Sequence, residues 1–332
     1  MTRSLVIAPQ WIGDAVMTEP LLHRLATRGE RLTVGALPWV APVYRAMPQV
    51  AAVIEFPFAH GGLQWRERQR LARQIDGQFD VAYLCPNSLK SALLPFLARI
   101  PKRVGYLGEA RVGLLTHRLK NPPKGQRPPM VAFYSALSGD HDIANDRPQL
   151  QLDPIEVETT LQQLNLRRGG YHVLAPGAEY GPAKRWPTRH FAALADQLAL
   201  PVVLLGAAKE AEMCAEIMRS ATTANIVNLA GKTTLAQALS VICATKFMMS
   251  NDSGLMHVGA GFGVPQVAIF GSSSPLHTPP LNAAAQVLWL KSDPAYQPAL
   301  DCAPCFERVC PLGHTRCLND ITPAMVRQHL PL

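Results

Sequence analysis

The motif Asn-Asp-Ser-Gly-Leu-Met-His at positions 251–257 contains a carboxylate, a hydroxyl and an imidazole. It lies between two apolar runs, at residues 247–250 and 266–271. Both runs have the composition of buried parallel strands, and the residues from Gly254 onward are apolar enough for a helix. Ser253 would then precede the first helical turn, where free backbone N–H groups and the helix dipole favour an anion such as a phosphate. The alternative is that Asp252 or Ser253 only caps the helix and that His257 is a core histidine.

A second candidate segment is the loop at residues 176–187, which lies between a predicted strand at 171–175 and a predicted helix from Thr188. Two glycines and three prolines restrict the shape of this loop, and Lys184 and Arg185 give it two adjacent positive charges. A cationic loop of fixed shape suits a diphosphate, although a Lys-Arg pair in a loop is often only solvated. The loop and the 251–257 motif both follow strands of one alternating β/α pattern. We therefore expect both at the same carboxyl edge of one sheet, where such folds bind ligands.

A third segment begins the chain, with a predicted strand at residues 4–8, a tight loop at 9–13 and a helix from Asp14 to about Arg28. An aspartate in the first turn of a helix is usually a cap or a partner of the dipole. This aspartate also follows a glycine at the carboxyl end of a strand, the edge at which such folds bind ligands. The loop lacks the Gly-x-Gly-x-x-Gly spacing of a dinucleotide site, and the chain has no P-loop motif. These absences disfavour nicotinamide dehydrogenases and P-loop ATPases.

Four motifs together resemble one known family. They are Trp-Ile-Gly-Asp at 11–14, Pro-Asn-Ser-x-Lys-Ser at 86–91, the 176–187 loop and the 251–257 motif. In combination they are similar to the ADP-heptose:lipopolysaccharide heptosyltransferases, which form glycosyltransferase family 9. The 176–187 loop is more similar to the heptosyltransferases II of that family than to the heptosyltransferases I. The resemblance extends from residue 5 to about residue 325.

The resemblance implies an α/β protein of the GT-B class, with two Rossmann-like doubly wound domains facing across a cleft. The acceptor-binding domain would span residues 1–152, and the domain that binds ADP-heptose would span residues 153–321. A linker near 148–156 would join them. The last segment, 322–332, would form a helix that packs back on the first domain. The length of 332 residues agrees with two domains.

The family transfers L-glycero-D-manno-heptose from ADP-heptose to the lipopolysaccharide inner core with inversion at the anomeric carbon. For a heptosyltransferase II the acceptor is the first heptose, carried by heptosyl-Kdo2-lipid A. Three alternatives stay open: another inner-core heptosyltransferase (I or III), a nucleotide-sugar epimerase, and a non-catalytic lipopolysaccharide-binding protein.

The resemblance also implies roles for individual residues. Asp14 would be the general base, and Lys184 would neutralise the departing diphosphate. Position 179 is a glutamate here, whereas the heptosyltransferases I have a threonine at that place, so the resemblance does not define the contact that Glu179 makes. The donor-binding candidates are Glu179, Tyr180, Arg185, Asp252, Ser253, Gly254, Leu255 and His257, and the acceptor-binding candidates are Asn87, Ser88, Lys90 and Arg103. Because no Asp-x-Asp motif marks the donor loops, we expect catalysis to require no metal or other cofactor.

The chain has a formal net charge of +8, and the excess of positive charge is concentrated in one segment. Between Lys90 and Arg127 the only acid is Glu109, against a larger set of bases: Lys90, Arg99, Lys102, Arg103, Arg111, Arg118, Lys120, Lys124 and Arg127. Such a segment predicts a polyanionic partner, unless it is only a solvated face. No helix-turn-helix or finger pattern is present, which disfavours nucleic acid. A phosphorylated glycolipid at a membrane agrees with both the charge and the resemblance.

The chain has no secretory signal pattern and no apolar run long enough to cross a bilayer. We therefore expect a cytoplasmic, monomeric protein that contacts the inner leaflet of the inner membrane peripherally.

The seven cysteines fall into two groups. Cys85, Cys214 and Cys243 lie in apolar contexts typical of core thiols. The other four, together with a histidine, lie within sixteen residues: Cys302, Cys305, Cys310, His314 and Cys317. Such a cluster could hold a structural zinc or iron, or it could be a local structural element with reduced thiols. Disulfides are disfavoured in a reducing compartment.

Overall fold

The computed structural model describes residues 1–58, 62–126, 128–140 and 146–330. The chain divides into two compact units, Met1–Gln151 and Leu152–Leu332. The division falls inside the predicted linker at 148–156. Directly after it, the Asp153 side chain accepts a hydrogen bond from the Ile155 backbone N–H (2.8 Å) and caps the first helix of unit 2.

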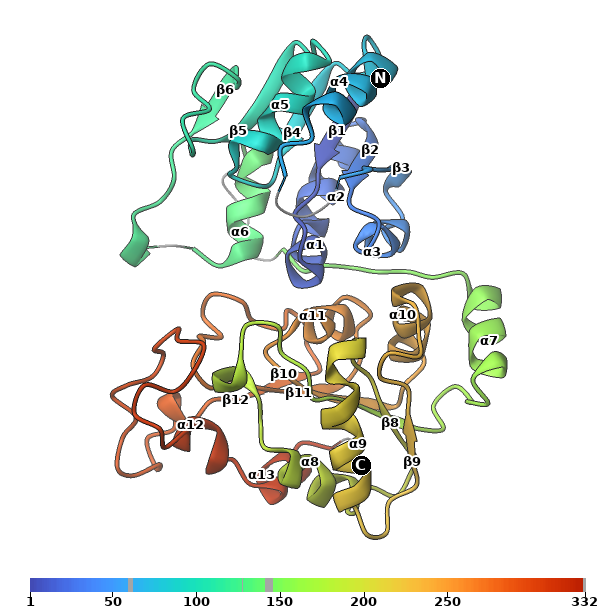
Figure 1. Cartoon of the computed structure of the whole chain (residues 1–332), viewed down its shortest axis with the longest axis vertical. Helices are drawn as coiled ribbons and strands as arrows, with labels where there is room; N and C mark the ends of the chain where they lie inside the picture. Colours follow the sequence, from blue (N-terminus) through green and yellow to red (C-terminus); the bar gives the residue numbers. More distant parts are fainter. Residues whose placement is uncertain (59–61, 127, 141–145, 331–332) are drawn as a thin grey trace. The chain divides into compact units, whose positions relative to one another are not determined.

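Unit 1 contains a six-stranded parallel sheet with the strand order β3-β2-β1-β4-β5-β6 (Figure 1). The strands are β1 (Arg3–Ile7), β2 (Arg31–Ala36), β3 (Val50–Glu55), β4 (Val81–Leu84), β5 (Lys102–Tyr106) and β6 (His117–Leu119). The chain leaves β1 in one direction to make β2 and β3, and it returns to the other side of β1 to make β4. The carboxyl ends of β1 and β4 therefore form the topological switch point of this sheet, where doubly wound folds bind ligands.

The helices of unit 1 form two groups. They are α1 (Ile12–Met17), α2 (Glu19–Thr27), α3 (Ala41–Arg45), α4 (Trp65–Ile75), α5 (Leu89–Leu97) and α6 (Met130–Ser135), with short 3₁₀ turns η1 (Lys124–Gln126) and η2 (Ala136–Ser138). Helices α4 and α5 pack on each other and, through residues such as Leu71 and Leu94, on the side chains of Leu5 and Ile7 from β1. Helices α1, α2, α3 and α6 contact one another in a second group, which the right-handed crossover rule assigns to the opposite face.

Unit 2 repeats the same topology. Its sheet has the order β12-β11-β10-β7-β8-β9, so its switch point lies between β7 and β10. The strands are β7 (His172–Ala175), β8 (Val202–Leu204), β9 (Ile226–Asn228), β10 (Phe247–Asn251), β11 (Gln266–Ile269) and β12 (Ala285–Leu288). Both units are therefore Rossmann-like, as the resemblance implies.

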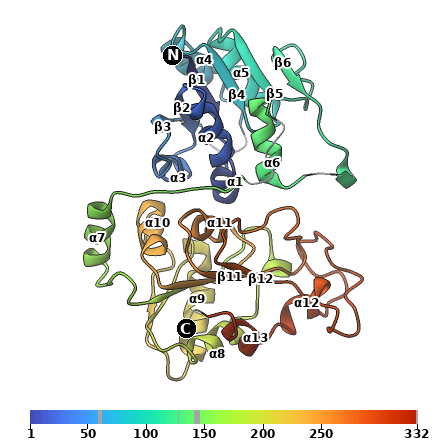
Figure 2. The same ribbon diagram turned by 180° about the vertical axis from the view of Figure 1, so that it is seen from behind.

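The helices of unit 2 are also divided between the two faces of the sheet, as the two opposite views show (Figures 1 and 2). The elements are α7 (Pro154–Gln163), η3 (Pro182–Lys184), α8 (Thr188–Ala195), η4 (Ala208–Glu210), α9 (Ala211–Ser220), α10 (Leu235–Cys243), α11 (Gly254–Gly261), η5 (Leu290–Ser292), α12 (Arg316–Asn319) and α13 (Pro323–Arg327). Helices α8, α9 and α13 pack together, and α10 packs on α7 and α11. The final helix, expected to return to the first domain, belongs to unit 2, where Val326 is buried in the same core as Phe191 of α8.

The single helix expected from Asp14 to Arg28 is two helices, α1 and α2, which meet at Thr18. Pro20 has no backbone N–H and cannot continue the hydrogen-bond ladder of α1. The Thr18 hydroxyl donates to the Ala15 carbonyl (2.7 Å) at the break. Within the described residues, no helix is both long and apolar enough to cross a membrane.

Candidate functional site

The switch point of unit 2 brings Lys184 and Asp252 together. Lys184 ends η3 in the loop after β7, and Asp252 directly follows β10, which pairs in parallel with β7. Lys184 Nζ lies 2.5 Å from Asp252 Oδ2, and the two side chains are only 18% and 6% exposed. The prediction that the two loops share one sheet edge is confirmed. A partly buried lysine at this edge can bind an anion, because desolvation strengthens its charge interactions.

His257 lies in the same cluster, one turn into α11, and is buried. Burial lowers the pKa of His257 to about 4; the nearby Asp252 carboxylate opposes this shift and Lys184 adds to it. The imidazole is therefore neutral at neutral pH. The positive charge of the cluster comes from Lys184.

Asn251 holds the two loops in register, a role that the sequence reasoning missed. Its side-chain Oδ1 accepts from the Trp186 N–H (2.9 Å), and its Nδ2 donates to the Pro176 carbonyl (2.7 Å). The side chain is fully buried at the end of β10. Both ends of the Lys184 loop are thus tied to the strand that carries Asp252. The sequence signal for this contact is an asparagine at the end of an apolar, strand-like run, because a buried amide side chain requires hydrogen-bond partners.

Ser253, Gly254 and Leu255 are placed as predicted, at the start of α11. Ser253 is the N-cap residue, but its side chain makes no capping hydrogen bond. The Ser253 hydroxyl oxygen is buried and has no hydrogen-bond partner among the described residues. The Ser253 side chain therefore does not serve as a helix cap. Its hydroxyl and the first backbone amides of the helix suit an anionic ligand.

Three other donor candidates make their contacts with groups outside this cluster. Glu179 forms an exposed ion pair with Lys209. The Tyr180 hydroxyl donates to the Phe306 carbonyl (2.9 Å). Arg185 donates to the carbonyl of Ala178 (3.1 Å from Nη2) and so stabilises the fold of its own loop.

The cysteine-rich segment lies directly behind the Lys184 turn. The Ala183 N–H donates to the Arg308 carbonyl (3.1 Å), and Arg308 Nε donates to the Tyr180 carbonyl (2.8 Å). A Cβ atom at Gly181 would lie 2.4 Å from the Arg308 carbonyl oxygen, so only glycine allows this approach. The shape of the 176–187 loop therefore depends on a segment far away in the sequence.

In unit 1, Asp14 lies in the first turn of α1, after β1 and at the switch point of the sheet. The N-cap residue of α1 is Trp11, so Asp14 is not the cap. The buried Tyr134 hydroxyl of α6 donates to Asp14 Oδ1 (2.8 Å). Burial and the Asp14 carboxylate raise the pKa of Tyr134 well above its ordinary value, so the phenol stays a neutral donor. This contact joins residues 120 positions apart, and no sequence motif indicates it.

Asn87, Ser88 and Lys90 follow β4, the strand beside β1, and so lie at the same switch point as Asp14. Ser88 is the N-cap residue of α5 and accepts from the Ser91 N–H (3.3 Å). Lys90 lies in the first turn of that helix. These three acceptor candidates lie together at the amino end of α5.

Arg111 supports this turn, and the sequence reasoning missed it. Its fully buried guanidinium donates to the carbonyls of Tyr106, Pro86 and Ser88, to Asn87 Oδ1 and to Ser91 Oγ. Burial lowers the pKa of Arg111 to about 10, against the effect of Glu109. Arg111 therefore stays charged at neutral pH and holds the β4–α5 turn in place.

Arg103 is placed apart from the other acceptor candidates. It lies near the amino end of β5, the opposite edge of the sheet, and its guanidinium donates to the Leu114 and Ile100 carbonyls (2.6 Å each). The basic segment from Lys90 is therefore not a single surface, because Arg111 is buried and Arg99 pairs with Asp76. Arg127 lies outside the described residues.

Comparison with known proteins agrees with this architecture. The chain is 40% identical to lipopolysaccharide heptosyltransferase 2 of Escherichia coli K12, over 99% of this chain and 97% of that protein. It is 37% identical to lipooligosaccharide heptosyltransferase 2 of Haemophilus influenzae, over 86% of this chain and 88% of the relative. The solved structure of the E. coli ADP-heptose heptosyltransferase II matches with a TM-score of 0.84 at 38% identity, covering 99% of this chain and 97% of that one. The model of glycosyltransferase family 9 (heptosyltransferase) matches residues 68–315.

The chain belongs to glycosyltransferase family 9. It is a heptosyltransferase of the GT-B fold class, and the predicted family and α/β fold are confirmed.

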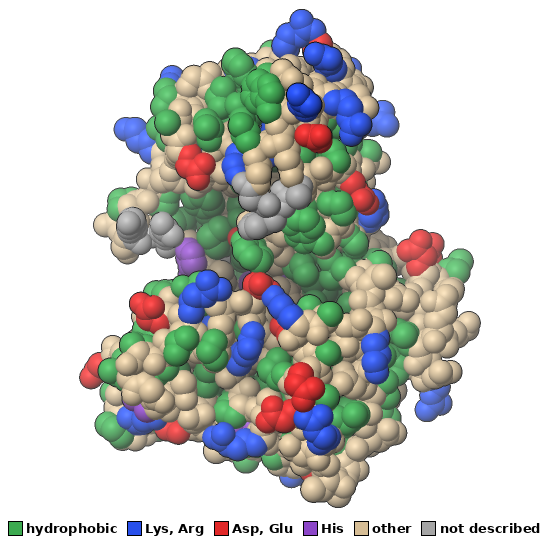
Figure 3. All heavy atoms as spheres, viewed as in Figure 1, with side chains coloured by type: hydrophobic (Ala, Val, Ile, Leu, Met, Phe, Trp, Pro, Cys, Tyr) green, Lys and Arg blue, Asp and Glu red, His purple; other side chains and the backbone are tan. Residues whose placement is uncertain are grey.

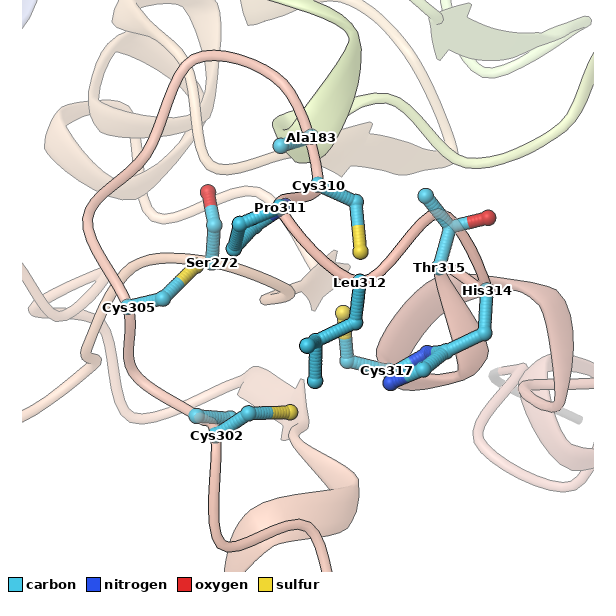
Figure 4. Close-up of a pocket in the computed structure, with 11 residues that line it drawn as sticks. Ala183, Ser272, Cys302, Cys305, Cys310, Pro311, Leu312, His314, Thr315 and Cys317 are labelled. Atoms are coloured by element: carbon cyan, nitrogen blue, oxygen red, sulfur yellow. The ribbon is translucent and has the colours of Figure 1, made fainter.

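The cysteine cluster of this heptosyltransferase surrounds one cavity of about 20 Å³. Cys302, Cys305, Cys310, His314 and Cys317 all line it (Figure 4). The apolar side chains of Pro311 and Leu312 line the same space. The expectation of a zinc or iron here is not supported, because no group of three or more His, Cys, Asp and Glu side chains in the described ranges is placed to hold a metal ion.

Cys310 is expected to be the most reactive thiol of this cluster. Burial acts to raise the pKa of Cys310, but hydrogen bonds from the backbone N–H groups of residues 312–315 outweigh burial and lower it. Burial raises the pKa of Cys317 to about 11 and that of Cys214 to about 12. Because the thiolate is the nucleophile, iodoacetamide at a pH of about 7.5, roughly one unit below the ordinary thiol pKa of about 8.5, should label Cys310 first. Peptide mass spectrometry over a time course measures the order, and earlier labelling of Cys317 or Cys214 would contradict the prediction.

Proposed function

We propose that this heptosyltransferase transfers L-glycero-D-manno-heptose from ADP-heptose to the first heptose of the lipopolysaccharide inner core, with inversion. The similarity to lipopolysaccharide heptosyltransferase 2 over 99% of the chain carries this proposal. The acceptor would be heptosyl-Kdo2-lipid A at the inner leaflet of the inner membrane.

The donor diphosphate would bind at the switch point of unit 2. Lys184 would neutralise the charge that develops on the departing ADP, and the first amides of α11 with the Ser253 hydroxyl would bind phosphate oxygens. Asp252 holds Lys184 in place, since the two groups lie 2.5 Å apart. Neutral His257 would supply a hydrogen bond to the donor.

The acceptor would bind at the switch point of unit 1. Asp14 would take the proton from the attacking heptose hydroxyl, and the 2.8 Å hydrogen bond from Tyr134 orients its carboxylate. Asn87, Ser88 and Lys90 would contact the phosphorylated inner core. Each step of this displacement uses side chains or backbone amides of the protein, and we assign no step to a metal or another cofactor.

The direct test is incubation with ADP-heptose and defined truncated core acceptors, followed by mass spectrometry of the product. We expect the heptosyl-Kdo2-lipid A acceptor to gain one heptose. Transfer to an acceptor without heptose would indicate heptosyltransferase I instead. Conversion of ADP-heptose alone into an isomer would indicate an epimerase, and acceptor binding without product would indicate a non-catalytic binding protein.

Lys90 provides a more specific test of the acceptor side. Lys90→Glu should raise the Michaelis constant for the glycolipid acceptor by roughly ten- to a hundredfold, the usual effect of one hydrogen bond to a charged group. The constant for ADP-heptose should stay unchanged, and added salt should weaken acceptor binding by the wild type. Lys102→Glu makes the same charge change at the amino end of β5 and is the matched control. An equal effect of both variants, or a loss of donor affinity, would contradict the assignment.

A further inference from the structure

The outer side of α5 is apolar and exposed. Leu89 and Phe96 are 38% and 44% exposed, and Leu93 and Leu97 are partly exposed. Their spacing of four, three and one residues places all four on one side of the helix. The other side, with Ala92 and Leu94, is buried against the sheet. A soluble helix normally has polar residues on the outer side, so this apolar stripe requires an explanation.

The neighbouring helix α4 has a basic outer side. Arg66, Arg70 and Arg73 are exposed and follow one another at spacings of four and three residues. They lie opposite the buried side of α4, which contains Leu71 and Ile75. The two helices are in contact, and Arg68 Nη1 donates to the Lys90 carbonyl (2.9 Å).

The apolar and basic stripes form one continuous surface. Hydrophobic side chains gather over α5, and Lys and Arg side chains lie beside them on the α4 side (Figure 3). Trp65, at the start of α4, is 43% exposed. An apolar stripe, flanking arginines and an exposed aromatic side chain are the features of a surface that lies in a bilayer interface. The long arginine side chains can reach lipid phosphates while their aliphatic parts cover apolar surface.

We propose that the outer surface of α4 and α5 docks this protein on an anionic membrane. Leu89, Leu93 and Phe96 would enter the headgroup region, while Leu97 also packs on the core, and Arg66, Arg70 and Arg73 would bind lipid phosphates. The docking proposal rests on the proposed function, because the proposed acceptor is held in the membrane by its lipid A part. The amino end of α5 carries Ser88 and Lys90, so docking brings the acceptor residues to the membrane.

Co-sedimentation with vesicles tests the surface without any substrate. The full-length protein should bind vesicles of phosphatidylethanolamine with phosphatidylglycerol, and bind phosphatidylcholine vesicles far more weakly. The triple variant Arg66→Glu, Arg70→Glu, Arg73→Glu should lose roughly a hundredfold or more in partitioning, from the usual share of each basic residue at an anionic surface. The double variant Leu93→Ser, Phe96→Ser should also release the protein.

A matched control changes three exposed basic residues of unit 2, as Arg167→Glu, Lys232→Glu and Lys246→Glu. This control has the same net charge as the first triple variant and should bind vesicles like the wild type. Equal loss in the control, or full binding by both surface variants with wild-type melting temperatures, would overturn the proposal. So would a wild-type dimer that the surface variants dissociate, because the surface would then bind a second copy.

Activity measurements separate this proposal from the proposed function. With a delipidated core oligosaccharide as acceptor, the surface variants should keep wild-type kcat/KM; with acceptor in anionic vesicles they should lose activity in parallel with binding. Absence of product from wild type with either acceptor would reject the proposed function, while vesicle binding would still decide the docking surface.

Discussion

Replacement of Asp14 by asparagine should lower turnover by roughly 10²–10⁴-fold, the usual share of a positioned general base. Asparagine keeps an oxygen that can accept from the Tyr134 hydroxyl but cannot take a proton from the acceptor. Because Trp11 is the N-cap residue of α1, the variant loses no cap, and its melting temperature should stay close to that of the wild type. The measurements are steady-state turnover, ADP-heptose affinity and thermal unfolding. Normal turnover would remove Asp14 from the mechanism.

Tyr134→Phe is the companion variant, since it removes only the hydroxyl that donates to Asp14 Oδ1. A hydrogen bond to a carboxylate favours its ionised form. Loss of this hydrogen bond should therefore move the acidic limb of the pH profile of kcat/KM to higher pH. The loss of rate should be smaller at high pH than at low pH. An unchanged profile combined with a lower melting temperature would show that Tyr134 only packs the core.

Lys184→Ala should lower turnover by roughly 10²–10³-fold, on the scale known for one lost donor to a developing negative charge. The variant also leaves Asp252, which is 6% exposed, without its charged partner. Loss of stability is therefore expected as well, by about 3 kcal/mol or more if the pair behaves as fully buried and by less if solvent relaxes around it. Lys184→Arg should rescue only part of the rate, because a forked guanidinium does not replace a point charge.

The double variant Lys184→Ala, Asp252→Asn separates the two effects. Neutralising Asp252 removes the unpaired charge and should restore much of the stability. Turnover should stay low if Lys184 acts on the diphosphate. Recovery of both turnover and stability would show that Lys184 serves only to neutralise Asp252.

Local sequence patterns predicted those parts of the site that depend on strand order. Lys184 and Asp252 each follow a buried strand, and the parallel pairing of those strands is sufficient to bring them together. Tyr134 and Arg111 were missed because their partners come from other elements through single side-chain contacts, which no periodicity encodes. The sequence reasoning groups Arg103 with Lys90 as an acceptor-binding candidate, whereas the direction of β5 places Arg103 at the opposite edge of the sheet.

The contact between Arg308 and the Lys184 turn has a consequence for synthesis of the chain. Residues 1–151 form a compact unit and can fold as soon as they leave the ribosome. The Lys184 turn cannot take its final form at that stage, because the Ala183 N–H pairs with the Arg308 carbonyl and Arg308 pairs with the Tyr180 carbonyl. A nascent chain that stalls before Arg308 would therefore have a folded unit 1 and an unfinished Lys184 turn. Under the proposed function, the site for the nucleotide sugar is therefore the last part of the protein to be completed in translation.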